Sequence, residues 1–252
     1  MVLFPLSDDN SDRRIIPVVN YALLAMNVFV FVVLQGLGQN EKFTLEYACV
    51  PREIIEGHDI PVPAREIVEP RTGQRIVIPS PPPTPIPVYF TILTAMFMHG
   101  GLMHLAGNML FLWIFGDNLE DAMGHLRYFI FYLLGGVLAT LCHVFFNVSG
   151  AGSLVPSLGA SGAISAVLGG YLLLFPHRRV RVLLFRMITD VPAIVAIGMW
   201  FVFQLIEGLG LLGGDSLGGG VAYAAHIGGF VAGLALVKPF MVGVQRGSRT
   251  FE

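Results

Sequence analysis

Long apolar stretches with very few charged side chains are the feature that most restricts how this chain can fold. They occupy residues 15–35, 88–116, 126–146, 191–212 and 221–237. A helix needs about 20 predominantly apolar residues to cross the hydrocarbon core of a bilayer. Charged residues make up only 13% of the chain, against about 25% in soluble domains. The sequence therefore predicts an integral, multi-pass, all-α membrane protein.

A sixth apolar stretch, LGASGAISAVLGGYLLLF at residues 158–175, is too short to cross a bilayer. Its helical part, residues 161–175, would be roughly 22 Å long at about 1.5 Å per residue, whereas the bilayer core is about 30 Å thick. Pro176 ends the stretch, and Arg178 marks a membrane surface. The other end must then begin inside the membrane, where irregular backbone is tolerated only beside protein or trapped water. We therefore expect the hydroxyl of Ser161 at a helix N-terminus in a wet cavity.

Six membrane segments place both ends of the chain on one side, and the basic residues indicate which side this is. Most Lys and Arg residues of the short loops and tails fall on the side of the termini, which the positive-inside rule makes cytoplasmic. We expect a cytoplasmic N-terminus at 1–14, a six-helix domain at 15–242 and a cytoplasmic tail at 243–252. A Pro-rich insertion at 36–87 lies outside in the first loop, and the serine cavity opens to the same extracytoplasmic side.

One histidine in the sixth membrane segment is the natural partner for this serine. Gly229 and Gly233 follow His226 at three and seven positions, so all three share one helix face, and a Gly-x-x-x-Gly face lets another helix approach closely. The short helix carries a matching row of small residues: Ser161, Ser165 and Gly169. A general base must lie about 2.6–3.2 Å from the hydroxyl that it activates. The two small faces make that distance attainable.

Two polar side chains of the second segment can supply the donors that a serine nucleophile needs for an oxyanion. His104 and Asn108 are four positions apart on one helix face, although such residues also serve as hydrogen-bonding contacts between membrane helices. The backbone N–H of Ser161, free at a helix start, is a third donor. No Asp or Glu is placed to complete a triad, so we expect a Ser–His dyad. The sequence lacks a His-Glu-x-x-His zinc motif, so we expect neither a metal nor a cofactor.

Three motifs, in this order, resemble the rhomboid family of intramembrane serine proteases. They are HGGLMHLAGN at 99–108, GASG at 159–162 and AHIGG-x-x-x-G at 225–233. The resemblance implies a six-helix bundle with a short fourth helix, Ser161 as nucleophile, His226 as general base, and His104, Asn108 and the Ser161 N–H as oxyanion donors. It also implies structural support from Gly159, Gly162, Gly229, Gly233, His99 and Glu120.

The resemblance further implies an endopeptidase that forms an acyl-enzyme and cleaves single-pass or multi-pass membrane proteins in or near the lipid bilayer. We expect it in a bacterial inner membrane, and the near-neutral charge gives no sign of a nucleic-acid partner. The chain departs from the family in two places. The Trp-Arg pair of the first loop is absent, and Ser165 stands where an aromatic ring often supports the catalytic histidine.

Other functions are open to a membrane protein of this composition. A non-catalytic rhomboid-like protein that binds membrane helices is the main alternative, although such relatives lose the serine or the histidine. A transporter with a proton relay would place paired carboxylates along its spans, and these spans contain almost none. An aspartyl intramembrane protease would need two aspartates within the membrane, and Asp215, in a predicted Gly-rich loop at 213–220, is the nearest candidate.

Overall fold

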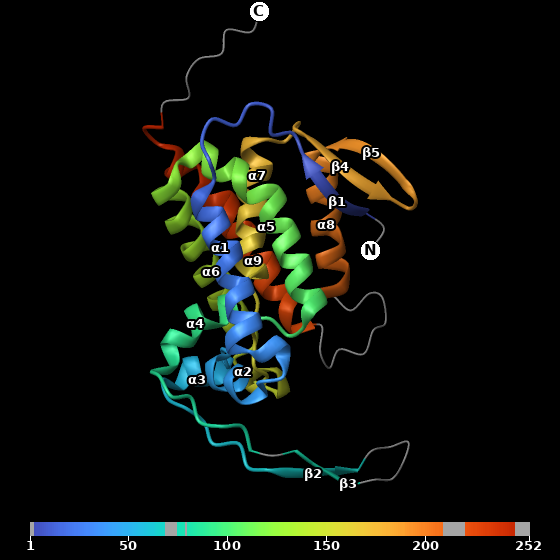
Figure 1. Ribbon diagram of the computed structural model, residues 1–252. Coiled ribbons are helices and arrows are strands. Elements are labelled where there is room, and N and C mark those ends of the chain that lie inside the picture. Colours follow the sequence, from blue (N-terminus) through green and yellow to red (C-terminus); the bar gives the residue numbers. More distant parts are fainter. Residues whose placement is uncertain (1–2, 69–74, 79, 209–219, 245–252) are drawn as a thin grey trace, which may run out of the picture.

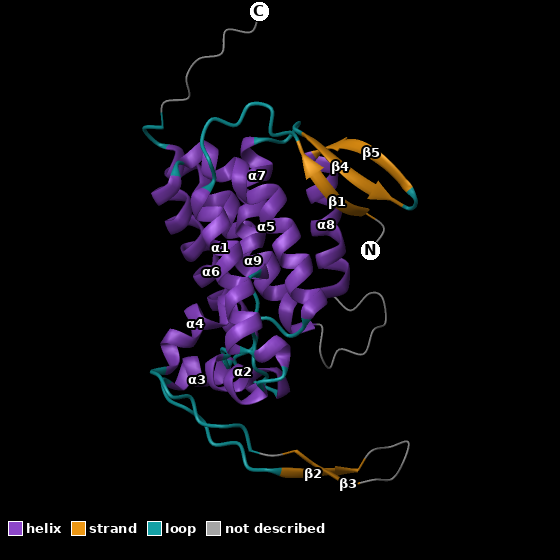
Figure 2. Cartoon of the chain, in the orientation of Figure 1, coloured by secondary structure: helices purple, strands orange, loops and turns teal. Residues whose placement is uncertain are grey.

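The computed structural model describes residues 3–68, 75–78, 80–208 and 220–244, and it shows a helical bundle (Figure 1). Six main helices form the bundle: α1 (Val18–Phe29), α5 (Leu102–Met123), α6 (His125–Phe146), α7 (Ser161–Leu174), α8 (Ala193–Gly208) and α9 (Gly220–Met241). A π-helical turn, Val30–Leu34, continues α1. A small sheet lies at one end of the bundle and a long hairpin at the other (Figure 2). The predicted Gly-rich loop at 213–220 and tail at 243–252 lie almost wholly outside the described residues.

Long apolar helices make this a membrane protein, but length alone does not make each of the six a span. Within the described part of the chain, His125–Phe146 and Tyr223–Met241 are long and apolar enough to cross a bilayer, and the bent pair Val88–Phe97 plus Leu102–Met123 is a third candidate. The apolar helices Val18–Leu34, Ser161–Leu174 and Ala193–Ile206 are shorter. Six crossings therefore remain a prediction, whereas a largely helical fold is observed.

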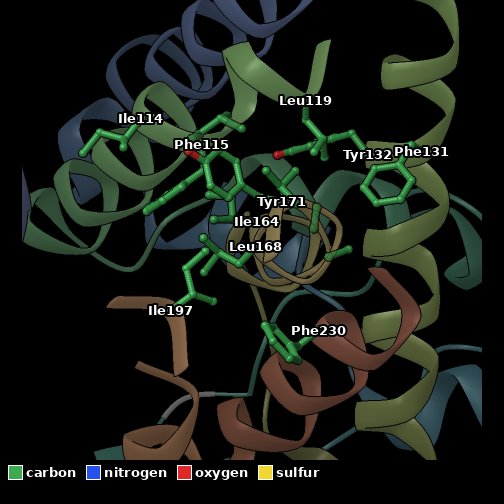
Figure 3. Packing of buried hydrophobic residues seen from close by; sticks show 14 of the residues in the cluster. Ile114, Phe115, Leu119, Phe131, Tyr132, Ile164, Leu168, Tyr171, Ile197 and Phe230 are labelled. Carbon is green, nitrogen blue, oxygen red and sulfur yellow. The ribbon is translucent and has the colours of Figure 1, made fainter. Parts of the chain in front are cut away.

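Helix α7 is the centre of the bundle. Every residue from Gly162 to Tyr171 is buried, as expected for a helix that is apolar all round. Figure 3 shows Ile164 and Leu168 of this helix packing with side chains of α5, α8 and α9, among them Phe230. The helix that carries the candidate nucleophile is thus held on all sides.

Glycines set the close contact between α7 and α9. A Cβ atom on Gly229 would overlap the carbonyl oxygen of Gly162, and one on Gly233 would overlap that of Ala166. The small-residue faces predicted from the sequence therefore do meet. On α7 the contact is made by Gly162, Ala166 and Gly169 rather than by Ser165, whose hydroxyl donates to the Ser161 carbonyl at 2.6 Å.

The charged segment at 116–127 is not the connection that its composition suggests. Helix α5 continues to Met123, and only Gly124, with φ +79°, separates it from α6. The charges do not end the helix because they are paired with the start of the chain. Asp117 accepts from Arg13 at 2.8 Å, and the carboxylate of Glu120 accepts the N–H groups that begin α1. A short charged connection at 116–127, which the composition of this stretch predicts, is therefore not observed.

The prediction of an all-α chain also needs correction, because the basic segment at 178–186 belongs to a small sheet. Strands β1 (Leu3–Asp8), β4 (Arg179–Leu184) and β5 (Met187–Pro192) form an antiparallel sheet in the order β1-β4-β5. Val180 and Val182 are fully buried, while Arg179 and Arg181, which alternate with them, are exposed. This alternation has the period of a half-buried strand.

The predicted insertion at 36–87 folds partly onto the bundle. It contains α2 (Glu41–Tyr47), α3 (Pro51–Glu56) and a hairpin of β2 (Arg65–Val68) and β3 (Arg75–Ile78). The chain then enters three short helical turns, η3 (Val88–Phe90), α4 (Thr91–Thr94) and η4 (Ala95–Phe97). These turns bend by 79° into α5. The apolar stretch at 88–116 is too long for one simple span, and the Gly100–Gly101 pair is the break that its sequence indicates. Cys49 and Ile54 of the insertion are buried against Val88, Ile92 and Val144.

Candidate active site

Ser161 and His226 meet at the interface between α7 and α9. Ser161 is the first residue of α7, and its Oγ lies 2.7 Å from Nε2 of His226, although 65 positions separate the two in the chain. The close glycine contacts between the helices make this short distance possible. The structure therefore brings together the two side chains that the sequence singles out as nucleophile and base.

The backbone before Ser161 is fixed by hydrogen bonds to the first loop. Cys49 and Ser157 exchange backbone hydrogen bonds of 3.0 and 2.8 Å, and the N–H of Gly159 donates to the Ala95 carbonyl at 2.8 Å. Gly159 has φ +135°, a conformation that side chains oppose. A Cβ there would also lie 3.0 Å from the ring of His104 and 3.5 Å from the Ser161 hydroxyl. Only glycine leaves this space open.

A small cavity of about 40 Å³ adjoins the pair. Ser157, Gly159, Ser161 and His226 line it, and Thr140 adds a further hydroxyl-bearing residue. A polar cavity needs roughly 10–15 Å³ to hold a water molecule, so this one admits water to the hydroxyl. The expectation of a wet cavity at the start of the short helix agrees with this space.

The residue that orients His226 is Gln204, which is not among the site residues predicted from the sequence. Gln204 of α8 places its amide oxygen 2.5 Å from Nδ1 of His226. With Nδ1–H donating to this oxygen, the proton is kept on Nδ1, and Nε2 is left as the acceptor that faces Ser161. The third residue of a catalytic triad is usually Asp or Glu, but a neutral amide can orient the histidine in the same way. The available signal was an amide side chain within an otherwise apolar stretch.

Aromatic rings surround His226 despite the serine at position 165. The rings of Trp200 and Tyr223 each lie 6.2 Å from the imidazole, centroid to centroid. Trp200 comes from α8 and Tyr223 from α9 itself, one turn before the histidine. The support that Ser165 cannot give is therefore supplied by other elements.

His104 and Asn108 lie in the first two turns of α5, and the ring of His104 lies beside Gly159 and Ser161. The N–H of Gly100 donates to Nδ1 of His104 at 3.3 Å, so the ring proton sits on Nε2. That nitrogen faces Gly159, close to the Ser161 hydroxyl. Asn108 is 8% exposed, and its Nδ2 has no hydrogen-bond partner in the part of the chain that the structure describes. The amide nitrogen of Asn108 is thus a donor without an acceptor, and the Nε2–H of His104 is a second donor on the same helix.

His99 and Glu120 hold backbone in place, which is the role expected from the resemblance. The amide of Gln35 pairs with the backbone of His99 through bonds of 2.9 and 3.0 Å, and the buried ring of His99 stacks edge-on against His104 at 5.2 Å. At the other end of the bundle, Glu120 accepts the N–H groups of Val19 and Asn20 at 3.0 and 2.7 Å. Neither residue contacts the Ser–His pair.

The far end of α7 is anchored to the sheet. The Tyr171 hydroxyl and the Asn118 amide each donate to Oδ2 of Asp8 at 2.7 Å. Arg178 in turn bonds to Asn118 and, at 2.8 Å, to Asp12. Burial raises the pKa of Asp8 to about 7, against the lowering effect of the Tyr171 hydrogen bond. This anchor therefore contains a carboxyl group that titrates near neutral pH.

Comparison with known proteins points to one family. A family model described as the rhomboid domain matches residues 87–242. Rhomboid protein 1, mitochondrial, of Saccharomyces cerevisiae is 33% identical over 57% of this chain and 40% of its own length. Rhomboid protease GluP of Bacillus subtilis is 33% identical over 60% of this chain and 27% of its own. The presenilin-associated rhomboid-like protein, mitochondrial, of Bos taurus is 32% identical over 50% and 36%.

These matches span well under half of the length of each of these relatives. Two of the three relatives are named as mitochondrial and one is bacterial, so they do not support the bacterial inner membrane predicted from the sequence. Groups of three or more side chains suited to a metal ion do not occur among the residues that the structure places.

Proposed function

We propose, starting from the premise that this chain belongs to the rhomboid family, that it is an intramembrane serine endopeptidase. The observation that carries the proposal is the hydrogen-bonded series Gln204–His226–Ser161, with contacts of 2.5 and 2.7 Å. A nucleophile, a base and a group that orients the base recur wherever serine is used for acyl transfer. A protein that only binds helices has no need for such a series.

The geometry supports a two-step reaction. Nε2 of His226 takes the proton of the Ser161 hydroxyl while Oγ attacks the carbonyl carbon of the scissile peptide bond. The resulting imidazolium is stabilised at Nδ1 by the Gln204 oxygen, and it returns the proton to the leaving amine. Water from the cavity then attacks the acyl-enzyme, with His226 again as base, and releases the acid product.

Three donors surround the position of the developing oxyanion. They are Nε2–H of His104, the amide of Asn108 and the backbone N–H of Ser161, which has no partner within the helix that it begins. Donors that are already oriented before the reaction stabilise negative charge without reorganisation, and each is worth about 10²–10³ in kcat. The unpaired Nδ2 of Asn108 supports this role, because a buried donor without a partner is otherwise costly.

The substrates that we propose are transmembrane proteins. The nucleophile lies on a helix that is buried within a bundle of apolar helices, and many large apolar side chains on the outer faces of α1 and α6 are exposed, as on a surface that contacts lipid. We also propose that the β1-β4-β5 sheet is cytoplasmic and that α2, α3 and the β2-β3 hairpin face outward. The side of the bundle with Ser161 then opens to the extracytoplasmic space.

A serine-reactive fluorophosphonate in detergent tests the proposal. We expect labelling of the wild-type protein and loss of labelling in Ser161→Ala and in His226→Ala, together with a loss of about 10⁴-fold or more in cleavage of a single-pass model substrate. Ser153→Ala is a matched control, since the hydroxyl of this serine donates to the Gly150 carbonyl and Ser153 does not line the catalytic cavity among the described residues. Equal labelling in wild type and both variants would contradict an enzymatic function.

A further inference from the structure

A second and larger cavity lies beside the active site, on the side of the insertion. Its volume is about 210 Å³, and its walls come from α3, the proline-rich chain at 80–84 and the loop before α7. The paired backbones of Cys49 and Ser157 separate the two spaces. Cys49 and Ser157 line the catalytic cavity. Val50, which follows Cys49, and Pro156, which precedes Ser157, line the second cavity.

Two carboxyl groups face this second cavity. Glu53 is only 6% exposed, and within the described ranges its Oε2 has no hydrogen-bond partner, while its Oε1 accepts the Ile60 N–H at 3.4 Å. Asp59 accepts the N–H of Thr84 at 3.0 Å. Burial raises the pKa of Glu53, and the neighbouring negative charge of Asp59 adds to this effect. A cation beside Glu53 would supply the partner that its Oε2 lacks and would keep the buried carboxyl group ionised.

We propose that this cavity is a subsite for a lysine or arginine side chain in the extracytoplasmic flank of the substrate. Apolar walls suit the methylene stem of such a side chain, and the two carboxyl groups suit its charged head. The apolar part of the wall consists of Leu45, Val50, Ile60, Pro61, Val62, Pro81, Pro82, Pro83, Leu154 and Pro156. The inference rests on the proposed protease function and gives the insertion a role in selecting substrates.

A metal ion fits this cavity less well than a basic side chain. Calcium takes six to eight oxygen ligands, whereas among the described residues two carboxylates line this space and each already accepts a backbone N–H.

The position of the cavity also limits where the basic residue can lie in the sequence of a substrate. Pro156 is five positions before Ser161, and an extended chain spans at most about 3.3–3.6 Å per residue. The basic residue is therefore expected within about five residues on the outward side of the scissile bond.

The test compares two single-pass substrates that differ only at one flank position, with lysine or methionine there. For the wild-type protein we expect the lysine substrate to have a KM lower by about tenfold, with kcat unchanged, the size expected for one charge-assisted contact. Glu53→Gln is expected to remove this preference by raising KM for the lysine substrate alone. Asp59→Asn should act in the same direction if Glu53→Gln does not fold. Glu56→Gln is the matched control, because Glu56 lies on the same helix and pairs with the exposed Arg52.

Fluorophosphonate labelling of Ser161 separates failure of the subsite from failure of the protease function. Labelling and cleavage with equal KM for both substrates in the wild type would overturn the subsite alone. Absence of labelling and of cleavage would overturn the protease function first. A loss of the lysine preference in Glu56→Gln as large as that in Glu53→Gln would also overturn the subsite, because it would reflect general surface charge. Cleavage of both substrates that stops with a calcium chelator would assign the cavity to a metal instead.

Discussion

The two ends of α7 are built in opposite ways. At the Ser161 end, the serine is hydrogen-bonded to His226, but the amide nitrogen of Asn108 has no hydrogen-bond partner among the described residues, and Gly159 leaves open space beside the hydroxyl. At Tyr171 the polar groups are joined to one another, with Asp8, Asn118 and Arg178 in one network. We infer that the unpaired donor lies at the end of α7 where an oxyanion would form during the reaction. The hydrogen-bonded donors lie at the end that holds the helix in place.

Of the substitutions that test this difference between the two ends of α7, Asn108→Ala is expected to change activity most. We expect kcat to fall about 10²–10³-fold with little change in thermal stability, because the lost donor has a partner only in the transition state. Asn27→Ala is the matched control, since this buried amide donates to the Leu23 carbonyl at 2.8 Å far from the site. The control should lose about 1 kcal/mol of stability and keep its kcat. An Asn108→Ala protein with normal kcat in a cleavage assay would remove the contrast between the two ends.

Gln204→Leu also tests the Ser161 end of α7, and its expected effect on activity is smaller. Without the amide oxygen, the imidazole of His226 loses the contact that keeps its proton on Nδ1, so kcat should fall by about 10–100-fold while KM stays constant. Gln204→Glu retains an acceptor and should recover part of the rate. Steady-state cleavage in detergent micelles measures both. A Gln204→Leu protein with unchanged kcat and raised KM would mean that the residue contacts the substrate rather than the base.

Asp8→Asn is expected to have the smallest effect on activity, and it tests the network at the Tyr171 end of α7. The pKa of Asp8 is raised from 3.8 to about 7 by burial, so the protonated form is the one that folding favours. The stability that it contributes is fully present below about pH 4 and is lost as pH rises through about 7. The free energy of unfolding of the wild type, followed by thermal unfolding, should therefore fall as pH rises between these values, and Asp8→Asn should remove most of that dependence.

A neighbouring residue supplies the control for this pH series. Hydrogen bonds from Ser11 lower the pKa of the exposed Asp9, so its small contribution is lost as pH falls rather than as it rises. Asp9→Asn should thus leave the weakening near pH 7 in place. If Asp8→Asn and the wild type weaken in parallel as pH rises, Asp8 is not the group that titrates in the anchor.

The parts of this fold that could be read from the sequence are those set by local pattern. The bend at Gly100 and Gly101 and the short helix that starts at Ser161 follow from residue type and length. The glycines of α9 at helical spacing predicted a close contact with α7, although on α7 the contacting residues are Gly162 and Ala166, with Gly169, rather than the predicted Ser161 and Ser165. These features depend on neighbours within one or two turns, which a single sequence displays.

The parts that could not be read depend on partners far away in the chain. Strand β4 pairs with β1, so Leu184 lies opposite Leu3. The local sequence around one strand does not indicate that the other is its partner. The charges at 117–120 are accepted within a helix because the N-terminal segment neutralises or caps them. Gln204 gains its role only once α8 stands beside α9. Local composition gives the wrong answer wherever a distant segment supplies the missing partner.

The pairing of β1 with β4 has a consequence for the order of events during synthesis. Strand β1 leaves the ribosome early, yet β4 follows only after α1, α5, α6 and α7 have been made. The sheet can close only when the helices between the two strands have brought both strands to the same end of the bundle. A helix packed in the wrong direction would leave β1 unpaired, with an exposed strand edge.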